Sequence, residues 1–413
     1  MDFEIQETPE AREFRKDVRA WLATNIPKDF PRHADPSDYS YDDFLKTRDL
    51  GRKLGELGWL WPTAPKKYGG GGLSIELGIA LEEELDQLDL SLPPYYDPGC
   101  RYGAPVLMVW GTEEQKTRLL PPMFKGEVAG WQLFTEPTSG SDLYSLKTTA
   151  VRDGNHYVLN GQKAFVGTAY DVDFFIILVR TDPKAERYKN LGWFQMPANL
   201  PGISRSPMRL LWTDGTGGAS NIVTFENVRV PASCLIGGEN NGFEVSKSWA
   251  ELEHGIAGTI RRNRLITRLF AYVKQAQRGG VHLIDDPQVR SVLTDIFITS
   301  EVNRLLGLRN YWMSRTQQPV TYQGPQASYI RKMSGLETAK NILKILGPYA
   351  LTSDPLWDLS DGHVEADQRH SICALHPGAT EDIQRVIMAR RIGIGRVEIE
   401  KPGKLTSLVT PVG

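Results

Sequence analysis

The sequence predicts an α+β fold of three consecutive parts: an N-terminal all-α domain, a central β-barrel or β-sandwich domain and a C-terminal four-helix bundle. Before about residue 125 and after about residue 241, apolar residues recur three and four positions apart, which is typical of amphipathic helices. Between these regions, alternating or continuous apolar runs are separated by turn sequences such as Asp-Gly-Asn, which is typical of strands. We expect the domains to span residues 1–128, 129–236 and 237–413.

The N-terminal part is predicted to be helical in the segments AREFRKDVRAWLATNI, DDFLKTRDLGRKLGELGWL and IELGIALEEELDQLD. The segment KKYGGGGLS interrupts this pattern with four consecutive glycines. No strand-Gly-Lys-Ser context accompanies it, so we interpret it as a flexible helix connector rather than a phosphate-binding loop.

The central part contains the β-type runs HYVLNGQKAFV, DFFIILVRT and NIVTFENVRV. The C-terminal part carries longer helical patterns, in four stretches that begin near residues 242, 286, 327 and 380. Helices of this length predict a bundle of antiparallel helices, a shape that often forms oligomers through its flat faces.

Composition excludes several classes of protein. The 413 residues, 40% hydrophobic and 24% charged, are enough for two or three globular domains. A formal net charge of −2 gives no general attraction to nucleic acid or to an anionic membrane. The longest apolar run, FFIILV, is far shorter than the roughly 20 residues of a membrane helix. We expect neither a nucleic-acid partner nor a membrane span.

The three cysteines lie far apart without CxxC or CxxH spacing, which predicts neither a disulfide framework nor a zinc site. The first residues, MDFEIQETPEAREFRKD, mix both charge signs and lack the basic-then-apolar layout of a secretory signal. We therefore expect no metal site and a cytoplasmic location.

The segment FTEPTSGSDL, Phe134 to Leu143, is the first candidate for chemistry. It follows an apolar run that predicts a short buried strand. A turn this rich in hydroxyl groups and backbone donors is typical of anion or cofactor cradles.

Five segments, in this order, resemble the acyl-CoA dehydrogenase family of flavoproteins. They are GWLWPTAPKKYGGGGLS, WGTEEQKTRLLPPMFKGEVAGWQLFTEPTSGSDL, VRDGNHYVLNGQKAFVGT, ENVRVPASCLIGGENNGF and TEDIQRVIMARRIGIGR. The resemblance implies FAD as cofactor, α,β-dehydrogenation of an acyl-CoA thioester in lipid metabolism, an acceptor such as an electron-transfer flavoprotein, and a homodimer or homotetramer.

The resemblance also implies which residues hold FAD. Phe134 and Thr135 would lie along the pyrimidine side of the flavin, and Gly140 and Ser141 would approach the pyrophosphate and the start of the CoA arm. The family's second flavin segment, roughly Gly-x-Lys-x-Trp followed by Thr or Ser, reads GQKAFVGT here. Its cofactor-binding positions are Phe165, Val166, Gly167 and Thr168.

This segment departs from the family pattern. Phe165 stands where the tryptophan is usual, and Gly167 stands where a hydroxyl usually approaches flavin N5. Thr168 or a water would have to replace that hydroxyl. In the bundle, the resemblance places Thr380 by FAD near the subunit interface and Gly347 against the adenosine half from a neighbouring subunit. The usual Arg-x-x-Phe-Gly element is missing, and the region reads QRGGVHLIDDPQVR.

Desaturation needs a carboxylate that removes the α proton. The position before the last helix that often carries it is Gly378. The family's other location, eleven residues after Gly242, is Glu253. Helical spacing places Glu253 on an apolar stripe, which would raise its pKa, and places Glu251 on a solvated face. We predict Glu253 as the base, although a half-buried Glu253 paired with an arginine is an alternative.

The predicted substrate contacts are Ser141, Trp249, His254 and Gly378. The resemblance implies that a flavin ribityl hydroxyl and a backbone N–H near Gly378 polarise the thioester oxygen. His254 stands where the family commonly has an arginine. Two alternatives stay open: an acyl-CoA oxidase or a non-dehydrogenating enzyme of the same fold, and a catalytically silent subunit of a hetero-oligomer.

Overall fold

The computed structural model describes residues 7–35, 38–88, 90, 92, 95, 98–167, 170–208, 210–211, 220–251, 264–316, 318–354 and 362–395. The chain divides into two compact units. The first comprises Ile5–Trp249 and the second is formed chiefly by Ala250–Gly413. The predicted boundaries at residues 128/129 and 236/237 stay a prediction.

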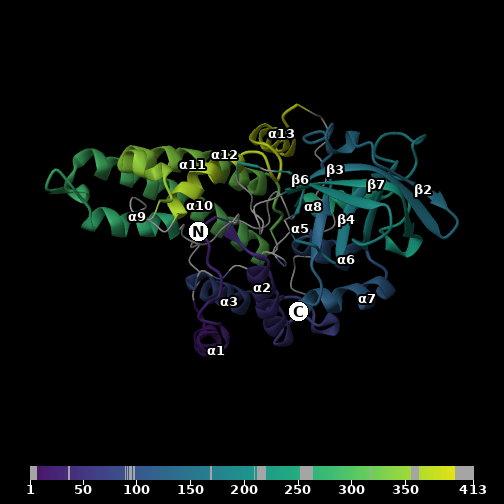
Figure 1. Ribbon diagram of the computed structural model, residues 1–413, viewed down its shortest axis with the longest axis horizontal. Helices are drawn as coiled ribbons and strands as arrows, with labels where there is room; N and C mark the ends of the chain where they lie inside the picture. Colours follow the sequence, from purple (N-terminus) through teal and green to yellow (C-terminus); the bar gives the residue numbers. More distant parts are fainter. Residues whose placement is uncertain are drawn as a thin grey trace. The chain divides into compact units, whose positions relative to one another are not determined.

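The N-terminal segment of the first unit is helical, as the sequence predicts (Figure 1). Two of its helices begin with capping boxes, Ser40 with Asp43 and Thr112 with Gln115, which satisfy backbone N–H groups that a helix start otherwise leaves free. The helices are α1 (Pro9–Asn25), α2 (Tyr41–Glu56), α3 (Ile75–Gln87), α5 (Pro98–Arg101), α6 (Gly103–Trp110) and α7 (Glu113–Phe124), with a short 3-10 turn, η2 (Lys66–Tyr68).

A single sheet of eight strands follows in the first unit, in the order β6-β7-β3-β2-β4-β5-β8, with β1 parallel to β4 (Figure 1). Neighbouring strands are otherwise mainly antiparallel. The strands are β1 (Gly130–Leu133), β2 (Thr149–Asp153), β3 (His156–Val166), β4 (Phe174–Arg180), β5 (Leu191–Pro197), β6 (Ile203–Met208), β7 (Ser220–Pro231) and β8 (Leu235–Ile236).

Continuous apolar strands lie at the centre of this sheet. Six of the seven residues of β4 are buried, which agrees with its unbroken apolar sequence and with cover on both faces. The side chains of Trp131, Phe175 and Phe194 belong to one core cluster between the strands. The β1 and β3 ends, where the predicted flavin segments begin, are therefore anchored in a close-packed core.

The four-glycine segment is not a flexible connector, so that expectation is wrong. The N–H groups of Gly70 and Gly71 donate to the carbonyls of Pro65 and Trp61, and a Cβ on Gly70 would lie 2.4 Å from the carbonyl oxygen of Ala64. Glycine is required because the loop lies directly against another backbone segment. Its donors are used internally, so it does not form a phosphate cradle.

The second unit is the helical bundle, in which α10, α11 and α12 lie side by side (Figure 1). Its core cluster includes Leu269, Ile296 and Ile342 from three different helices. The helices are α9 (Arg264–Gln275), α10 (Pro287–Arg315), α11 (Gln323–Leu346), α12 (His363–Cys373) and α13 (Glu381–Arg391), and α8 (Gly242–Glu251) precedes them. No helix among the described residues has both the length and the apolar character of a membrane span.

The predicted fold class is confirmed: helices, one β-domain and a helical bundle follow one another along the chain. Two elements of the bundle were not predicted. One is α12, and the other is a hairpin of β9 (Gln277–Arg278) and β10 (Val281–His282). Gly279 and Gly280 both have positive φ, +59° and +81°, as the tight turn of such a hairpin requires.

Candidate functional site

The first predicted flavin segment is a turn that leaves the sheet after β1. Thr135 accepts a hydrogen bond at its carbonyl from the N–H of Ala164, 2.9 Å away, which joins this turn to β3. Glu136 and Ser139 exchange backbone hydrogen bonds of 2.9 and 3.1 Å. The turn is therefore held at both its start and its middle, while Gly140 and Ser141 are exposed.

The donors of this turn are available. Within the described part of the chain, the backbone N–H groups of Thr135, Gly140 and Ser141 make no hydrogen bond. Unpaired N–H groups and a nearby hydroxyl are the donor set that a flavin ring and a pyrophosphate require. The residues present fit FAD on this criterion.

The ring of Phe134 is not free to contact a cofactor, so its contribution would be its backbone. The ring is buried between two indoles, with centroid distances of 4.8 Å to Trp193 and 4.6 Å to Trp249. Trp249 also donates from Nε1 to the side-chain carbonyl of Gln132 at 2.7 Å. The structure thus places two predicted residues, Phe134 and Trp249, in direct contact, and Trp249 packs α8 against β1.

The second predicted segment ends β3 in an unusual backbone conformation. Phe165 and Gly167 both lie in the left-handed region, with φ of +57° and +60°. The Phe165 ring is 58% exposed, whereas Val166 is buried and its carbonyl accepts from the amide of Asn221 at 3.1 Å. An exposed aromatic ring on a fixed backbone is suited to stack against a flat cofactor.

Trp131 explains why residue 167 is a glycine. A Cβ on Gly167 would lie 2.2 Å from two carbons of the Trp131 ring. That ring is fully buried and stacks on Phe175, with centroids 5.8 Å apart. The Trp131 ring therefore leaves no space at residue 167 for the hydroxyl-bearing side chain that the family usually has there. Thr168, the suggested replacement, lies outside the described residues.

A buried ion pair lies beneath both segments, and the sequence interpretation missed it. Lys163 of β3 is 0% exposed, and its Nζ donates to Oε1 of Glu136 at 2.9 Å, to the Phe134 carbonyl at 3.0 Å and to the Leu178 carbonyl at 2.8 Å. The available signal was one residue in each motif: Glu136 in FTEPTSGSDL and Lys163 in GQKAFVGT.

Both members of this pair are ionised near neutral pH. Burial lowers the pKa of Lys163 to about 8, against the opposing attraction of Glu136. Burial opposes ionisation of Glu136, but Lys163 and hydrogen bonds at Lys147 and Thr148 hold the pKa of this carboxyl below its usual range. A buried charge of this kind is tolerated only with such complete pairing.

The helix α8 corrects one expectation about the base. Glu251, predicted to be solvated, is only 8% exposed. Ser248 on the same stripe is also buried and accepts from Trp110 Nε1 at 3.0 Å, so α8 is covered on two sides rather than one. The helical-face argument therefore does not separate Glu251 from Glu253. Glu253 and His254 lie outside the described residues.

In the second unit, the loop before α13 carries Gly378 and Thr380. Lys332 of α11 donates from Nζ to the carbonyls of Ala374 and Pro377, and the buried amide of Gln384 donates to the carbonyl of Gly378 at 2.9 Å. The backbone N–H groups of residues 378–380 make no hydrogen bond within the described part of the chain. The carbonyl groups of this loop are therefore occupied by Lys332 and Gln384, whereas the N–H groups of residues 378–380 remain available as donors.

Thr380 is the N-cap of α13, because its hydroxyl accepts from the N–H of Ile383. Gly347 ends α11 with a φ of +61° and nothing within 4 Å of an added Cβ. Arg278, in the region that lacks the Arg-x-x-Phe-Gly element, donates to the carbonyl of Ile345 at 2.6 Å. This arginine therefore anchors the hairpin to the end of α11.

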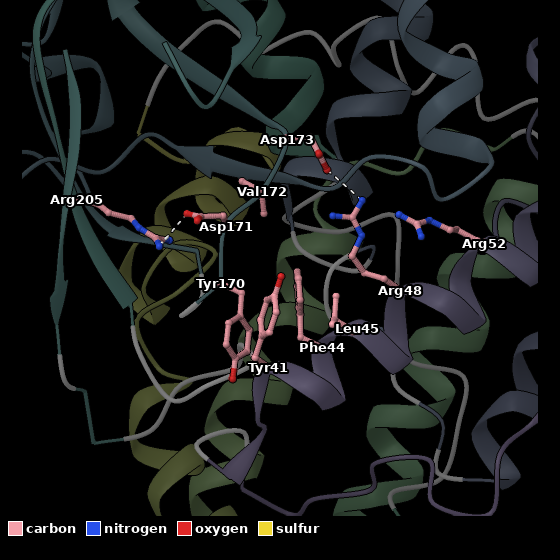
Figure 2. Close-up of a pocket in the computed structure, with 10 residues that line it drawn as sticks. All are labelled: Tyr41, Phe44, Leu45, Arg48, Arg52, Tyr170, Asp171, Val172, Asp173 and Arg205. Atoms are coloured by element: carbon pink, nitrogen blue, oxygen red, sulfur yellow. Dashed lines mark hydrogen bonds and ion pairs between the residues drawn. The ribbon is translucent and has the colours of Figure 1, made fainter. Parts of the chain in front are cut away.

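A cavity of about 360 Å³ lies between α2 and residues 170–173 (Figure 2). One side carries the ion pair Arg205–Asp171 (2.8 Å) and the other Arg48–Asp173 (3.2 Å), with the rings of Tyr41, Phe44 and Tyr170 below them in this view. Both carboxylates of this cavity pair with an arginine, and none of the predicted site residues lines it.

Comparisons with known proteins find the same three domain models along the chain. Residues 8–127 match the profile of the acyl-CoA dehydrogenase N-terminal domain, residues 132–228 that of the middle domain and residues 241–393 that of the C-terminal domain. The curated relative "Acyl-CoA dehydrogenase FadE29" of Mycobacterium tuberculosis is 29% identical over 93% of this chain and 97% of its own length.

Solved structures show the same architecture. A variant of the Tcur3481-Tcur3483 steroid ACAD has a TM-score of 0.80 and 26% identity, covering 94% of this chain and 99% of that one. The ChsE4-ChsE5 complex from Mycobacterium tuberculosis also has a TM-score of 0.80 and 26% identity, over 95% and 100% of the two chains. The prolyl acyl carrier protein oxidase AnaB has a TM-score of 0.74 and 25% identity, covering 94% of this chain and 100% of that one.

Proposed function

The chain belongs to the acyl-CoA dehydrogenase family, whose members are oxidoreductases acting on CH–CH groups, and we propose that it binds FAD and introduces a double bond between the α and β carbons of an acyl-CoA thioester. The observation that supports this most is the turn at residues 135–141, where the N–H groups of Thr135, Gly140 and Ser141 have no partner in the described chain. The exposed ring of Phe165 follows Ala164, which is hydrogen-bonded to this turn.

FAD, when bound, supplies the acceptor for the hydride that leaves the β carbon. In this proposal the N–H and hydroxyl of Thr135 would orient the pyrimidine edge of the flavin. The N–H groups of Gly140 and Ser141 would contact the pyrophosphate or the CoA arm. Phe165 stacks on the ring system. Val166 and Gly167 contribute backbone only. Thr380 lies by the FAD near the subunit interface, and Gly347 contacts the adenosine half from a neighbouring subunit.

Glu253 is the proposed base: it takes the α proton, and its carboxylate becomes a carboxylic acid. A backbone N–H near Gly378 donates to the thioester oxygen, where negative charge develops as the proton leaves. Trp249 and His254 are proposed substrate contacts. Two electrons leave with the β hydride and pass to an external acceptor, such as an electron-transfer flavoprotein.

Glu251 is a second candidate for the base, because it is buried at the end of α8, two residues before Glu253 in the sequence. The test compares Glu253→Gln with Glu251→Gln in FAD-loaded protein mixed anaerobically with acyl-CoA. We expect Glu253→Gln to keep bound flavin and to slow its bleaching by about 10²–10⁴-fold. If flavin bleaches at the native rate in Glu253→Gln but much more slowly in Glu251→Gln, Glu251 is the base.

The same experiment separates the alternatives. AnaB, a structural neighbour, is named an oxidase, and rapid recovery of colour in air would favour that chemistry here. Protein that cannot be loaded with FAD would favour a silent subunit, as in a hetero-oligomeric assembly. The acyl-CoA panel should include ring-bearing acyl groups, because two similar structures are named steroid ACAD.

A further inference from the structure

The Glu136–Lys163 pair has no place in the chemistry described above, yet it contacts both predicted flavin segments. We propose that this pair is a positioning device that sets the spacing between the turn at residues 134–141 and the end of β3, and thereby the affinity for FAD. The proposal rests on the proposed function.

The lysine links three elements. Its ammonium group has three protons, and the structure uses all of them: one bond goes to Glu136, one to the carbonyl of Phe134 and one to the carbonyl of Leu178 in β4. Lys163 itself is two residues before Phe165. A single side chain therefore fixes the first flavin segment, the second flavin segment and the central strand to one another.

The Glu136 carboxylate joins the turn at residues 134–141 to the residues just before β2. Oε2 of Glu136 accepts from the N–H of Lys147 at 2.6 Å, and Oε1 accepts from the N–H of Thr148 at 3.0 Å. Gly140 and Ser141 lie on the loop that these two bonds close. With the Ala164–Thr135 backbone bond beside it, the pair leaves the cradle little freedom before a cofactor arrives. Preorganisation of this kind raises affinity because less order has to be imposed on binding.

The pair also makes the cradle sensitive to alkaline pH. Glu136 is the only charged group among the described residues that acts on the Lys163 ammonium, and burial lowers the pKa of that lysine to about 8. Above this pH the lysine loses a proton, and with it one of three hydrogen bonds and the charge that balances Glu136. We expect the cradle to loosen as the pH rises through this value.

The test measures the dissociation constant of FAD by flavin fluorescence at about pH 7 and about pH 9.5. The double variant Glu136→Gln/Lys163→Met keeps the volume and removes both charges, and circular dichroism checks that it folds. Its control is Glu186→Gln/Lys189→Met, which neutralises an exposed pair in the same β-domain. Because deprotonation of Lys163 removes one of its three hydrogen bonds and its charge, we expect native affinity to weaken about tenfold or more at the higher pH.

We expect the folded double variant to bind FAD about tenfold more weakly at neutral pH and to lack this pH dependence, whereas the control follows the native protein. A folded double variant with native affinity and a native pH profile would overturn the proposal. So would native affinity that is unchanged at alkaline pH, a result that needs no variant. Native protein that takes up no FAD at any pH would overturn the proposed function as well, which distinguishes the two failures.

Discussion

Gly167 shows how a departure from a family motif can have a packing cause. The sequence alone shows a missing hydroxyl next to the predicted flavin position. The structure shows that a side chain cannot be added, because the Trp131 ring occupies the space and the backbone has a φ of +60°. Replacing the glycine by the residue that the family prefers should therefore not restore the family arrangement.

We expect Gly167→Ser to lower the free energy of unfolding by about 2–4 kcal/mol, from overpacking against Trp131 and from left-handed strain. Urea denaturation measures the change. Gly154→Ser is the matched control, since Gly154 has nearly the same φ, +59°, with nothing within 4 Å of an added Cβ. If both variants lose the same stability, the contact with Trp131 is not the reason for the glycine.

Glu251 marks the limit of helical-face reasoning at single residues. The stripe that includes Ser246 and Trp249 is buried, as the spacing predicts. Ser248 and Glu251 are buried as well, and Trp110 contacts α8 at Ser248. Periodicity identifies a face that is apolar, but it does not reveal a polar face that another element covers. Periodicity therefore does not decide between Glu251 and Glu253 as the base, and Glu253 stays a prediction.

Among the elements, the glycine-rich loop differs most from its sequence interpretation. Consecutive glycines are permissive in isolation, and flexibility was the natural expectation. Here the loop crosses residues 61–65 at backbone contact distance and is held by a series of hydrogen bonds. Composition does not distinguish a flexible glycine run from one selected for close approach.

We expect Gly70→Ala to destabilise the first unit by about 1–3 kcal/mol, because its Cβ would meet the Ala64 carbonyl at 2.4 Å. Thermal unfolding followed by circular dichroism measures this. Gly140→Ala provides the comparison, since an added Cβ there meets nothing within 4 Å and the φ is not positive. Equal and small losses at both sites would show that the loop adapts, as a flexible connector does.

Strong periodic patterns identified most helices and strands, and weak ones were missed. The helix α10 and strand β4 lie where the apolar spacing predicts them. The helix α12, HVEADQRHSIC, carries few apolar residues at irregular positions, so its burial depends on contacts with α11 that no local pattern records. The predicted flavin segments were recognised by resemblance. The Glu136–Lys163 ion pair was not, because it depends on how β3 is aligned with its neighbours, which the sequence does not show.

At the scale of the whole molecule, the order of helical, β and helical parts could be predicted because each part buries its core with a different periodicity. The division into two compact units between Trp249 and Ala250 could not. It falls within α8, where the apolar pattern continues without a break. Unit boundaries depend on contacts between distant residues, and these leave no local signal at the boundary.

The acid stability of the molecule should depend on Glu84, which joins α3 to α1. Its carboxylate is 3% exposed and lies 2.6 Å from Arg19 Nε and 3.0 Å from Arg15 Nη1. Burial alone would raise the pKa of Glu84, but the hydrogen bonds to Arg19 and Arg15 hold it below its ordinary value. A carboxyl with a lowered pKa in the folded state contributes stability above its unfolded pKa of about 4.5, and this contribution is lost as the pH falls.

We therefore expect the free energy of unfolding to fall below about pH 4.5, and Glu84→Gln to reduce the slope of that fall while costing about 1–3 kcal/mol at neutral pH. Urea titrations at a series of pH values measure both effects. Glu13→Gln, at an exposed ion pair of α1, is the control and should change stability by less than about 0.5 kcal/mol. An acid slope that is unchanged in Glu84→Gln would mean that other carboxylates control the acid unfolding, because a residue that no longer titrates cannot contribute to the proton uptake that drives it.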